Sequence, residues 1–304
     1  MTMQVEIPFN RTPDFPPGEA RPVSPLIRRI VAPNPGAFTF QGTGTYIVGR
    51  GTVAVIDPGP MIESHLQAIL DALRGECVSH ILVTHTHIDH SPLARPLQRA
   101  TGAPVWGCGP HGRGRHEQGA KVEEGGDTEF APDRQLAHGD AVDGAGWTLE
   151  AVHTPGHTSN HLCFALREEN ALFTGDHVMG WSTSIISPPD GDMRAYMASL
   201  DLLQRRGDAV YWPTHGGPVR DPQPFVAAFV AHRKEREAAI LACLGGGIAR
   251  IREMVPRIYG STIPPGLYPA AARSVFAHVI DLAERGAVAA DGPIAIDTAY
   301  RLAR

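Results

Sequence analysis

Three histidines and one aspartate stand within six positions of the segment THTHIDHSP at residues 84–92; they are His85, His87, Asp89 and His90. The cluster directly follows Ile81-Leu82-Val83, an apolar and β-branched run that predicts a buried strand. Neutral imidazoles and ionised carboxylates suit zinc and its first-row neighbours as ligands. The chain is therefore expected to carry a metal site at one rim of a sheet. The weaker alternative is a histidine-rich surface loop that binds no metal.

Three further blocks supply ligands that this cluster lacks. They contain His157 in HTPGHTSNH (153–161), Asp176 in ALFTGDH (171–177) and His215 in VYWPTHGG (210–217). Each follows a short apolar segment and precedes a glycine or a turn. This pattern is typical of a sheet that gathers its loops into one site at one end.

The ordered set His-x-His-x-Asp-His, Gly-His-Thr, Thr-Gly-Asp and His-Gly resembles the motifs of the metallo-β-lactamase-fold hydrolases, from about Phe38 to about Pro218. The resemblance implies an α+β fold, a four-layer αβ/βα sandwich in which two mixed sheets pack face to face with helices outside. It also implies how the metal ligands divide. The first metal would be held by His85, His87 and His157, the second by Asp89, His90 and His215, with Asp176 bridging the two.

Two divalent cations roughly 4 Å apart can share one water and lower its pKa, which gives a hydroxide nucleophile at neutral pH. No serine or cysteine nucleophile is then needed. The chemistry fits hydrolysis of an ester, thioester, amide or phosphodiester, and the metals do not choose among them. Asp89 is predicted to be catalytic, because it would both ligate a metal and accept a hydrogen bond from the bridging hydroxide. Zinc is the first expectation, and the same ligands accept iron or manganese.

Three other histidines lie near the predicted ligands in the sequence. His153 is interpreted as a supporting residue, while His161 and His177 are expected to hydrogen-bond ligands or line the pocket, because ligating imidazoles usually need an outer partner.

Composition agrees with a globular enzyme. The 304 residues are 42% hydrophobic and 19% charged, and the net charge of -5 argues against indiscriminate nucleic-acid binding. No apolar run approaches the roughly 20 residues that span a bilayer, so no membrane association is expected. Residues 1–22 show no hydrophobic signal core and are predicted to form an extended, proline-rich arm. The four cysteines are scattered without a CxxC pair, which favours a reducing, cytoplasmic location.

Local patterns predict the elements around the motifs. Residues 38–58 indicate a strand, a GTGT turn and a further strand pair, and residues 62–73 have helical spacing. Residues 111–135 are polar and glycine-rich, which predicts a surface excursion that is either inert or lines the substrate entrance.

The character of the chain changes after about Asp221. Helices are predicted at 222–244, with HRKERE at its exposed middle, at 249–259 and at about 269–285; two short strands around an Asp-Gly turn then follow. This is the order of a winged helix. The predicted domains are a catalytic domain at 1–230 and a winged-helix-like domain at 231–304. The second part carries ten Lys/Arg against seven Asp/Glu.

With HRKERE, MVPRIYG and a winged helix after the motifs, the chain is similar to the β-lactamase-like protein 2 group. Some members of that group are single-strand-specific endoribonucleases, which leaves ribonuclease activity as an alternative. A non-catalytic metal-binding scaffold is a second alternative, although a structural zinc site normally closes at four ligands. The winged helix carries little excess positive charge for a domain that binds phosphate backbones. Nucleic acid is therefore not favoured as a partner, and the favoured role of the winged helix is that of a lid.

The substrate is expected to be a small molecule or an acyl group bound to a carrier. Trp181 to Ser184, with Pro188-Pro189, are predicted to form one wall of its cleft, and the C-terminal domain the opposite wall. A homodimer is an open alternative to a monomer.

Overall fold

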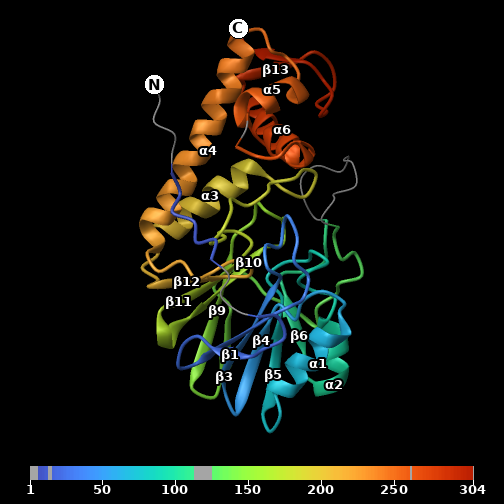
Figure 1. Ribbon diagram of the computed structural model, residues 1–304, viewed down its shortest axis with the longest axis vertical. Helices are drawn as coiled ribbons and strands as arrows, with labels where there is room; N and C mark the ends of the chain where they lie inside the picture. The colour runs from blue at the N-terminus through green and yellow to red at the C-terminus, as the bar shows by residue number, and fades with distance from the viewer. Residues whose placement is uncertain (1–5, 13–15, 113–124, 261, 304) are drawn as a thin grey trace.

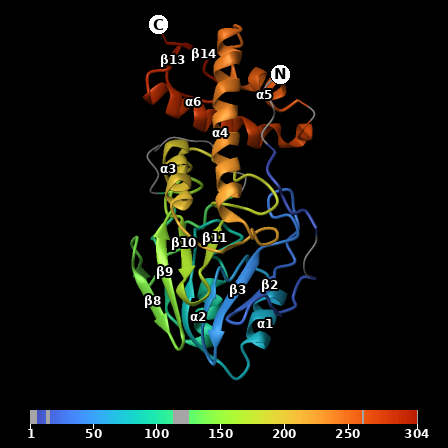
Figure 2. The same cartoon turned by 90° about the vertical axis from the view of Figure 1, so that its left-hand side faces the viewer.

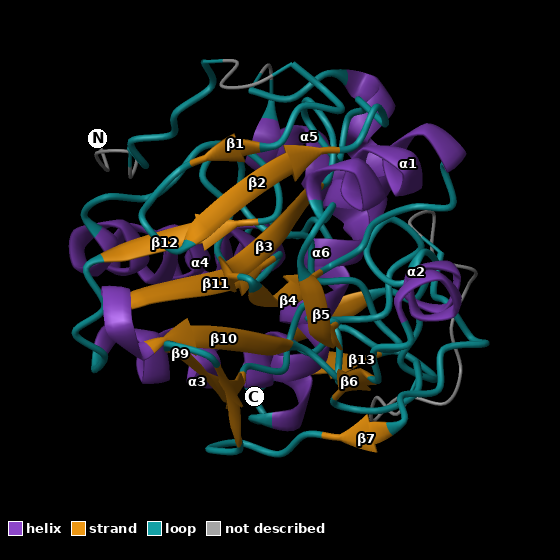
Figure 3. Ribbon diagram, turned by 90° about the horizontal axis from the view of Figure 1, so that it is seen from below, coloured by secondary structure: helices purple, strands orange, loops and turns teal. Residues whose placement is uncertain are grey.

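Two β-sheets lie face to face at one end of the molecule, and a group of helices caps the other end (Figure 1). The computed structural model describes residues 6–12, 16–112, 125–260 and 262–303. Seen from below, β2 to β5 of one sheet face β9 to β12 of the other, and α1 and α2 lie outside the first (Figure 3).

The first sheet has seven strands in chain order. They are β1 (Arg21–Pro22), β2 (Ile27–Val31), β3 (Gly44–Arg50), β4 (Thr52–Ile56), β5 (Cys77–Leu82), β6 (Val105–Gly107) and β7 (Arg134–Gln135). Strands β1 to β4 pair antiparallel, and β4 to β7 pair parallel. The turn between β3 and β4 places Gly51 at φ 72, a left-handed conformation that glycine adopts without a Cβ clash.

The second sheet has five strands, in the order β12-β11-β10-β9-β8. They are β8 (Ala141–Gly144), β9 (Trp147–His153), β10 (Leu162–Leu166), β11 (Ala171–Gly175) and β12 (Val210–Pro213), with a 3-10 turn, η1 (Arg167–Glu169), between β10 and β11. Strands β8 to β11 pair antiparallel, and β11 and β12 pair parallel.

Apolar side chains fill the space between the two sheets. Tyr46, Ile56 and Leu82 of the first sheet pack against Phe164 and Phe173 of the second, all of them fully buried. The opposite face of the first sheet packs against α1 (Glu63–Ala72) and α2 (Ala94–Thr101), through residues such as Ile69 and Leu97. The helix expected at 62–73 is confirmed as α1.

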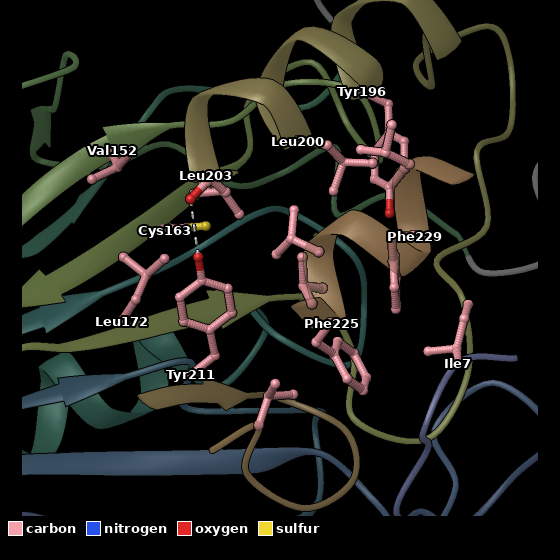
Figure 4. Packing of buried hydrophobic residues seen from close by; sticks show 14 of the residues in the cluster. Ile7, Val152, Cys163, Leu172, Tyr196, Leu200, Leu203, Tyr211, Phe225 and Phe229 are labelled. Carbon is pink, nitrogen blue, oxygen red and sulfur yellow. Dashed lines mark hydrogen bonds between the residues drawn. The ribbon is translucent and has the colours of Figure 1, made fainter. Parts of the chain in front are cut away.

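The outer face of the second sheet is covered by α3 (Met193–Gln204) and by the first half of α4 (Pro222–Gly245). Figure 4 shows Leu200 and Leu203 of α3 and Phe225 and Phe229 of α4 lying over the strand residue Tyr211. Helix, sheet, sheet and helix layers follow one another, which confirms the four-layer α+β sandwich.

The C-terminal part of the chain has its own apolar core around α4, α5 (Ile251–Tyr259) and α6 (Tyr268–Glu284), with a 3-10 turn, η2 (Pro265–Leu267), before α6. The three predicted helices are confirmed. The predicted hairpin is only partly right, because β13 (Val288–Ala290) pairs with β14 (Tyr300–Leu302), and residues 291–299 form a longer loop instead of a tight Asp-Gly turn.

Helix α4 passes through both parts of the molecule (Figure 2). Its first half, with Phe229, belongs to the core over the second sheet, and its second half, with Ile240, belongs to the C-terminal core. The predicted domain boundary at 230/231 lies inside this helix and stays a prediction. The expectation of an exposed HRKERE segment is wrong for Arg233 and Arg236, which are only 3% and 8% exposed because α6 and the 181–185 loop lie close to this side of the helix.

Two details of the N-terminal half differ from expectation. Residues 38–58 hold two strands where three were expected, and Gly44 and Thr45 of the GTGT segment open β3. The strand β2 was missed because two arginines interrupt its apolar pattern; Arg29 is buried and donates to the carbonyl oxygens of Thr214 and Gly216.

The proline-rich arm lies on the domain where it is described. Phe9 contacts Phe225 and Phe229 of α4, with ring centroids 6.0 and 6.1 Å apart. Part of the polar excursion expected at 111–135, residues 113–124, lies outside the described residues, while Phe130 in its second half is buried.

Candidate metal centre

The residues singled out from the sequence follow strand ends that meet at one edge of the two sheets. The loop 83–92 follows β5, His157 follows β9, Asp176 follows β11 and His215 follows β12. Strands β9, β11 and β12 run in the same direction, so their carboxyl ends share an edge. The structure groups the seven predicted ligands by distances between their donor atoms into a first set, His85, His87 and His157, and a second set, Asp89, His90 and His215; a further group, His85, His90 and Asp176, overlaps both.

The first set brings three imidazoles to one point. His85 Nε2 and His157 Nε2 lie 3.0 and 3.1 Å from His87 Nδ1. On its far side, His157 Nδ1 donates to the carbonyl oxygen of Ile185 at 2.7 Å. His85 Nδ1 lies 3.0 Å from Thr84 Oγ1, whose own proton goes to Asp57. Each inner Nε2 therefore carries a lone pair, because a neutral imidazole has one N–H only.

The second set joins two imidazoles to a carboxylate. Asp89 Oδ2 lies 3.1 Å from His215 Nε2 and 3.3 Å from His90 Nε2. His215 Nδ1 donates to the carbonyl oxygen of Gly42 at 3.1 Å, which again turns Nε2 inward.

Asp176 lies between the two sets. Its Oδ2 is 3.4 Å from His215 Nε2, 3.6 Å from His90 Nε2 and 3.8 Å from His157 Nε2. This carboxylate faces both groups of nitrogens, the position of a bridging ligand.

The electrostatics of the centre fit a cation at each set. Burial and the neighbouring histidines hold the pKa values of His85 and His87 well below the ordinary value, so a proton is not retained among the three imidazoles. Burial lowers the pKa of His215, but Asp176 and Asp89 outweigh it and raise the value to about 10. The second set thus requires positive charge, supplied by protons or by a metal that displaces them.

Two buried polar atoms at the centre have no hydrogen-bond partner among the described residues, namely His90 Nε2 and Asp176 Oδ1. A buried nitrogen and a buried carboxylate oxygen are costly to leave unpaired. Coordination of divalent metals would satisfy both, so the residues present fit the implied metals.

Sequence reasoning missed Asp57, which supports the centre from beneath. Its carboxylate accepts hydrogen bonds from the backbone N–H and hydroxyl of Thr84, at 2.8 and 2.7 Å, and from the Thr214 hydroxyl at 3.1 Å. It also lies 3.0 Å from His90 Nδ1. A signal was available in Val55-Ile56-Asp57-Pro58-Gly59, a carboxylate at a strand end like Asp176, but no ligand pattern accompanied it.

Thr43 was also missed. Its hydroxyl donates to Asp89 Oδ2 at 3.0 Å, and its own backbone N–H donates to Asn34. The Asp89 side chain is 19% exposed, more than the carboxylate of Asp176 at 10% or the imidazole of His215 at 1%. Asp89 is thus fixed by a neighbouring hydroxyl and still reachable from solvent.

The three supporting histidines behave differently from one another. His161 Nδ1 contacts Thr154 Oγ1 at 2.8 Å, and its Nε2 accepts from the backbone N–H of Asp176 at 3.3 Å. His177 is fully buried beside the Tyr196 ring, and burial lowers its pKa to about 3. His153 Nε2 lies 3.3 Å from the carbonyl oxygen of Ser159, and the His153 backbone N–H donates to Nδ1 of the His138 side chain. None of the three belongs to the grouped donor sets.

A cavity of about 180 Å³ opens onto the centre, lined by His87, Asp89, His157 and Asp176 on one side and by Phe38, Met179 and Ile185 on the other. Those last three residues also line a second cavity of about 300 Å³, between the sandwich and the C-terminal helices. Trp181 to Ser184 lie along the second cavity, as expected for a cleft wall, whereas Pro188 lines a different small hollow against α6.

Comparison with known proteins agrees with this geometry. A family model described as the metallo-beta-lactamase superfamily matches residues 37–215, which hold all seven grouped residues. The chain belongs to the metallo-β-lactamase superfamily. A model of the beta-lactamase associated winged helix domain matches residues 251–294, which confirms the winged helix behind the sandwich.

Relatives of this superfamily member include fungal proteins. The chain is 32% identical over 284 residues to an atrochrysone carboxyl ACP thioesterase of Aspergillus novofumigatus, covering 88% of this chain and 82% of that protein. It is 32% identical over 290 residues to a protein of the same description from Aspergillus terreus, with 90% and 83% covered. Family and site together make the protein a metal-dependent hydrolase.

Solved structures share the whole fold. A beta-lactamase domain protein from Burkholderia ambifaria has a TM-score of 0.79 at 21% identity, over 100% of this chain and 99% of that one. A metallo-beta-lactamase family protein from Thermus thermophilus has a TM-score of 0.72 at 24% identity, over 92% and 100%. Within the described residues, no helix combines the length and apolar character needed to cross a membrane.

Proposed function

We propose that this metallo-β-lactamase superfamily member hydrolyses the thioester that joins an acyl group to a carrier protein. The observation that carries the proposal is the pair of neighbouring cavities, one at the grouped predicted ligands and a larger one beside α4, which share Phe38, Met179 and Ile185 in their walls. A small lactam would not need that second space, whereas an acyl chain would. The relatives described as carboxyl ACP thioesterases support the same substrate class.

In this proposal two divalent metals occupy the centre. His85, His87 and His157 would hold the first, Asp89, His90 and His215 would hold the second, and Asp176 would serve both. When bound, the metals supply Lewis-acid polarisation of the thioester carbonyl and a water of lowered pKa. Zinc is the first expectation for the metal.

The protein's own residues position the reactants. Asp89 Oδ2, held by the Thr43 hydroxyl, faces the cavity and accepts the proton of the attacking water. The carbon–oxygen bond forms as the carbon–sulfur bond breaks, so that water and thioester become carboxylic acid and thiol. A thiol is acidic enough to leave as a thiolate, so no general acid is required on the leaving side.

Phe38, Met179 and Ile185 supply an apolar wall beside the centre, which limits the access of bulk water once a chain fills the cavity. His161 positions Asp176 by accepting a hydrogen bond from its backbone N–H. Asp57 positions His90 through the contact with His90 Nδ1.

The endoribonuclease alternative is less well supported. Arg285, directly after α6, is engaged by Glu237 and Asp281, at 2.7 and 3.0 Å, and is thereby partly neutralised as a contact for phosphates. The C-terminal helices form one wall of the larger cavity, an arrangement that fits a lid over an acyl chain. A non-catalytic metal-binding scaffold would not need the cavity that opens onto the centre.

The experiment is a turnover assay of the full chain, loaded with zinc, against an acyl-carrier thioester, a simple ester, a lactam and single-stranded RNA. Thioester hydrolysis at least ten times faster than that of the other compounds supports the proposal. Preferred cleavage of RNA would establish the ribonuclease alternative, and no turnover with two bound metals would establish the scaffold. The cytoplasmic location and the homodimer stay predictions.

A further inference from the structure

The larger cavity contains two buried cationic side chains that the proposed reaction does not use. Arg233 and Arg236 stand one turn apart on α4 and line the cavity together with His232. They are 3% and 8% exposed. Both face the space between the 181–185 loop and helix α6.

Arg233 is held in place without a counterion. One guanidinium nitrogen donates to the carbonyl oxygen of Ser184, and the group lies 5.1 Å from the Tyr196 ring centroid. Its Nε has no hydrogen-bond partner, and no carboxylate of the described chain forms an ion pair with it. A buried guanidinium in this state is costly, since it has lost water and gained no anion.

Arg236 is in a similar position. It donates to the carbonyl oxygen of Ile258 at 3.0 Å and lies 5.3 Å from the Tyr259 ring centroid, and its Nε also has no hydrogen-bond partner among the described residues. Its carboxylate contact is Glu235 at 3.8 Å, a long distance for an ion pair. Arg233 and Arg236 therefore leave an excess of positive charge at the cavity wall.

The other residues that line the cavity indicate which chemical class of ligand it fits. Ile7, Phe9, Met179, Ile263 and Leu267 supply apolar surface, and the buried Nε1 of Trp181 is a further hydrogen-bond donor without a partner. Apolar walls with a few convergent donors are typical of a site for an organic anion.

A carrier-bound thioester consists of an acyl chain and the prosthetic arm of the carrier. Only the acyl chain can place an anionic group in the larger cavity. The carrier's prosthetic arm bears its phosphate where it joins the carrier, so that charge stays outside with the protein. A carboxylate or an acidic enol along the acyl chain has no such constraint.

We propose that this cavity binds the acyl chain, and that Arg233 and Arg236 select chains that carry an anionic oxygen remote from the thioester. The inference rests on the proposed thioesterase function and specifies its substrate class. Hydrogen bonds between charged partners are stronger than neutral ones, so the preference for an anionic chain should be tenfold or more.

The kinetic test compares two thioesters of N-acetylcysteamine, the suberoyl thioester with a free terminal carboxylate and its methyl ester. The zinc-loaded full chain is expected to show at least tenfold higher kcat/KM for the free acid. Arg236→Gln should bring the ratio of the two values towards one, and Arg236→Lys should restore part of it. Lys234→Gln is the matched control, because it removes one positive charge from the exposed side of the same helix and should keep the ratio.

A binding measurement separates this inference from the proposed function. Calorimetry with monomethyl suberate should show binding to the wild-type protein that weakens at least tenfold in Arg233→Gln and Arg236→Gln, and much weaker binding of dimethyl suberate. If no thioester is hydrolysed but this binding is found, the proposed function fails and the anion site stands. If the wild-type protein hydrolyses or binds the acid and the ester equally well, the anion site is overturned, even where a variant does not fold.

Discussion

His90 Nδ1 lies 3.0 Å from Asp57 Oδ2, so the ring is held with its Nε2 facing Asp89 and Asp176. Asp57 comes directly after β4 with a φ of 49, a left-handed conformation that is uncommon outside glycine. Because the same carboxylate binds Thr84 and Thr214, it ties the loops after β4, β5 and β12 together beneath the centre. Asp57 is a positioning residue.

Asp57→Asn is expected to remove the second metal selectively. The amide would present N–H groups where the carboxylate now accepts, so His90 would carry its proton on Nε2 and could not ligate. Metal analysis should then find about one equivalent, or affinity for the second lowered 10- to 100-fold. Asp208→Asn is the control, because Asp208 is also a buried aspartate but pairs with Arg206. Unchanged metal content in Asp57→Asn would contradict the positioning role.

The wild-type protein is expected to bind two metal ions, which can be removed one at a time. His157→Ala should weaken the first site and His215→Ala the second, because each removes one inward Nε2 from a different group. Elemental analysis after zinc reloading, with titration of each variant, checks this. A wild-type protein that never exceeds one equivalent would show the two-metal arrangement to be wrong.

Asp89→Ala is expected to lower turnover by orders of magnitude, since it removes a ligand and the acceptor of the water proton; proton transfer alone contributes about 10²–10⁴-fold. Thr43→Val should cause a smaller loss, because the carboxylate stays and only its hydroxyl contact is removed. The measurement is kcat with metal content determined in the same samples. Near-normal turnover of Asp89→Ala with two bound metals would rule out the proposed role.

His278 of α6 should make the protein less stable in acid. Both its ring nitrogens are buried and have no hydrogen-bond partner in the part of the chain that the structure describes, and burial, with Arg233 nearby, lowers its pKa to about 3. Below the unfolded pKa of roughly 6.5 the unfolded chain binds a proton that the folded chain does not. Its contribution to stability is therefore complete above pH 6.5 and is lost as pH falls towards 3.

Urea unfolding at pH 8 and pH 5 measures this effect. The wild-type protein should lose about 2 kcal/mol more between these pH values than His278→Leu does, because the leucine has no proton to bind. Because both proteins contain the other histidines, the contributions of those residues to the loss of stability cancel in the difference. Equal losses in the two proteins would show that His278 is protonated in the folded state as well.

A chain ending near residue 228 would not give a clean test of a lid. The truncation would cut α4 in the middle and remove Phe229 and Val230 from the core over the second sheet. The point variants of α4 test the same cavity with both cores intact.

The fold could be predicted through the resemblance of the ordered motifs to the metallo-β-lactamase-fold hydrolases, and the meeting of the predicted ligands could be predicted from the positions of the residues. The histidines and aspartates stand directly after apolar runs, and strand ends that share an edge must bring such residues together. The helical spacing of α1 could be recognised in the same way, because its apolar residues pack against a single core.

The surroundings of the centre, in contrast, depend on tertiary packing. Asp57 gains its role from Thr84, His90 and Thr214, which are distant from it in the chain, so no local pattern could assign it. In the sequence, Arg233 and Arg236 are typical of a solvated helix face. They are buried because loop 181–185 and α6 pack against that face of α4, and burial is a property of the neighbours that a segment acquires on folding.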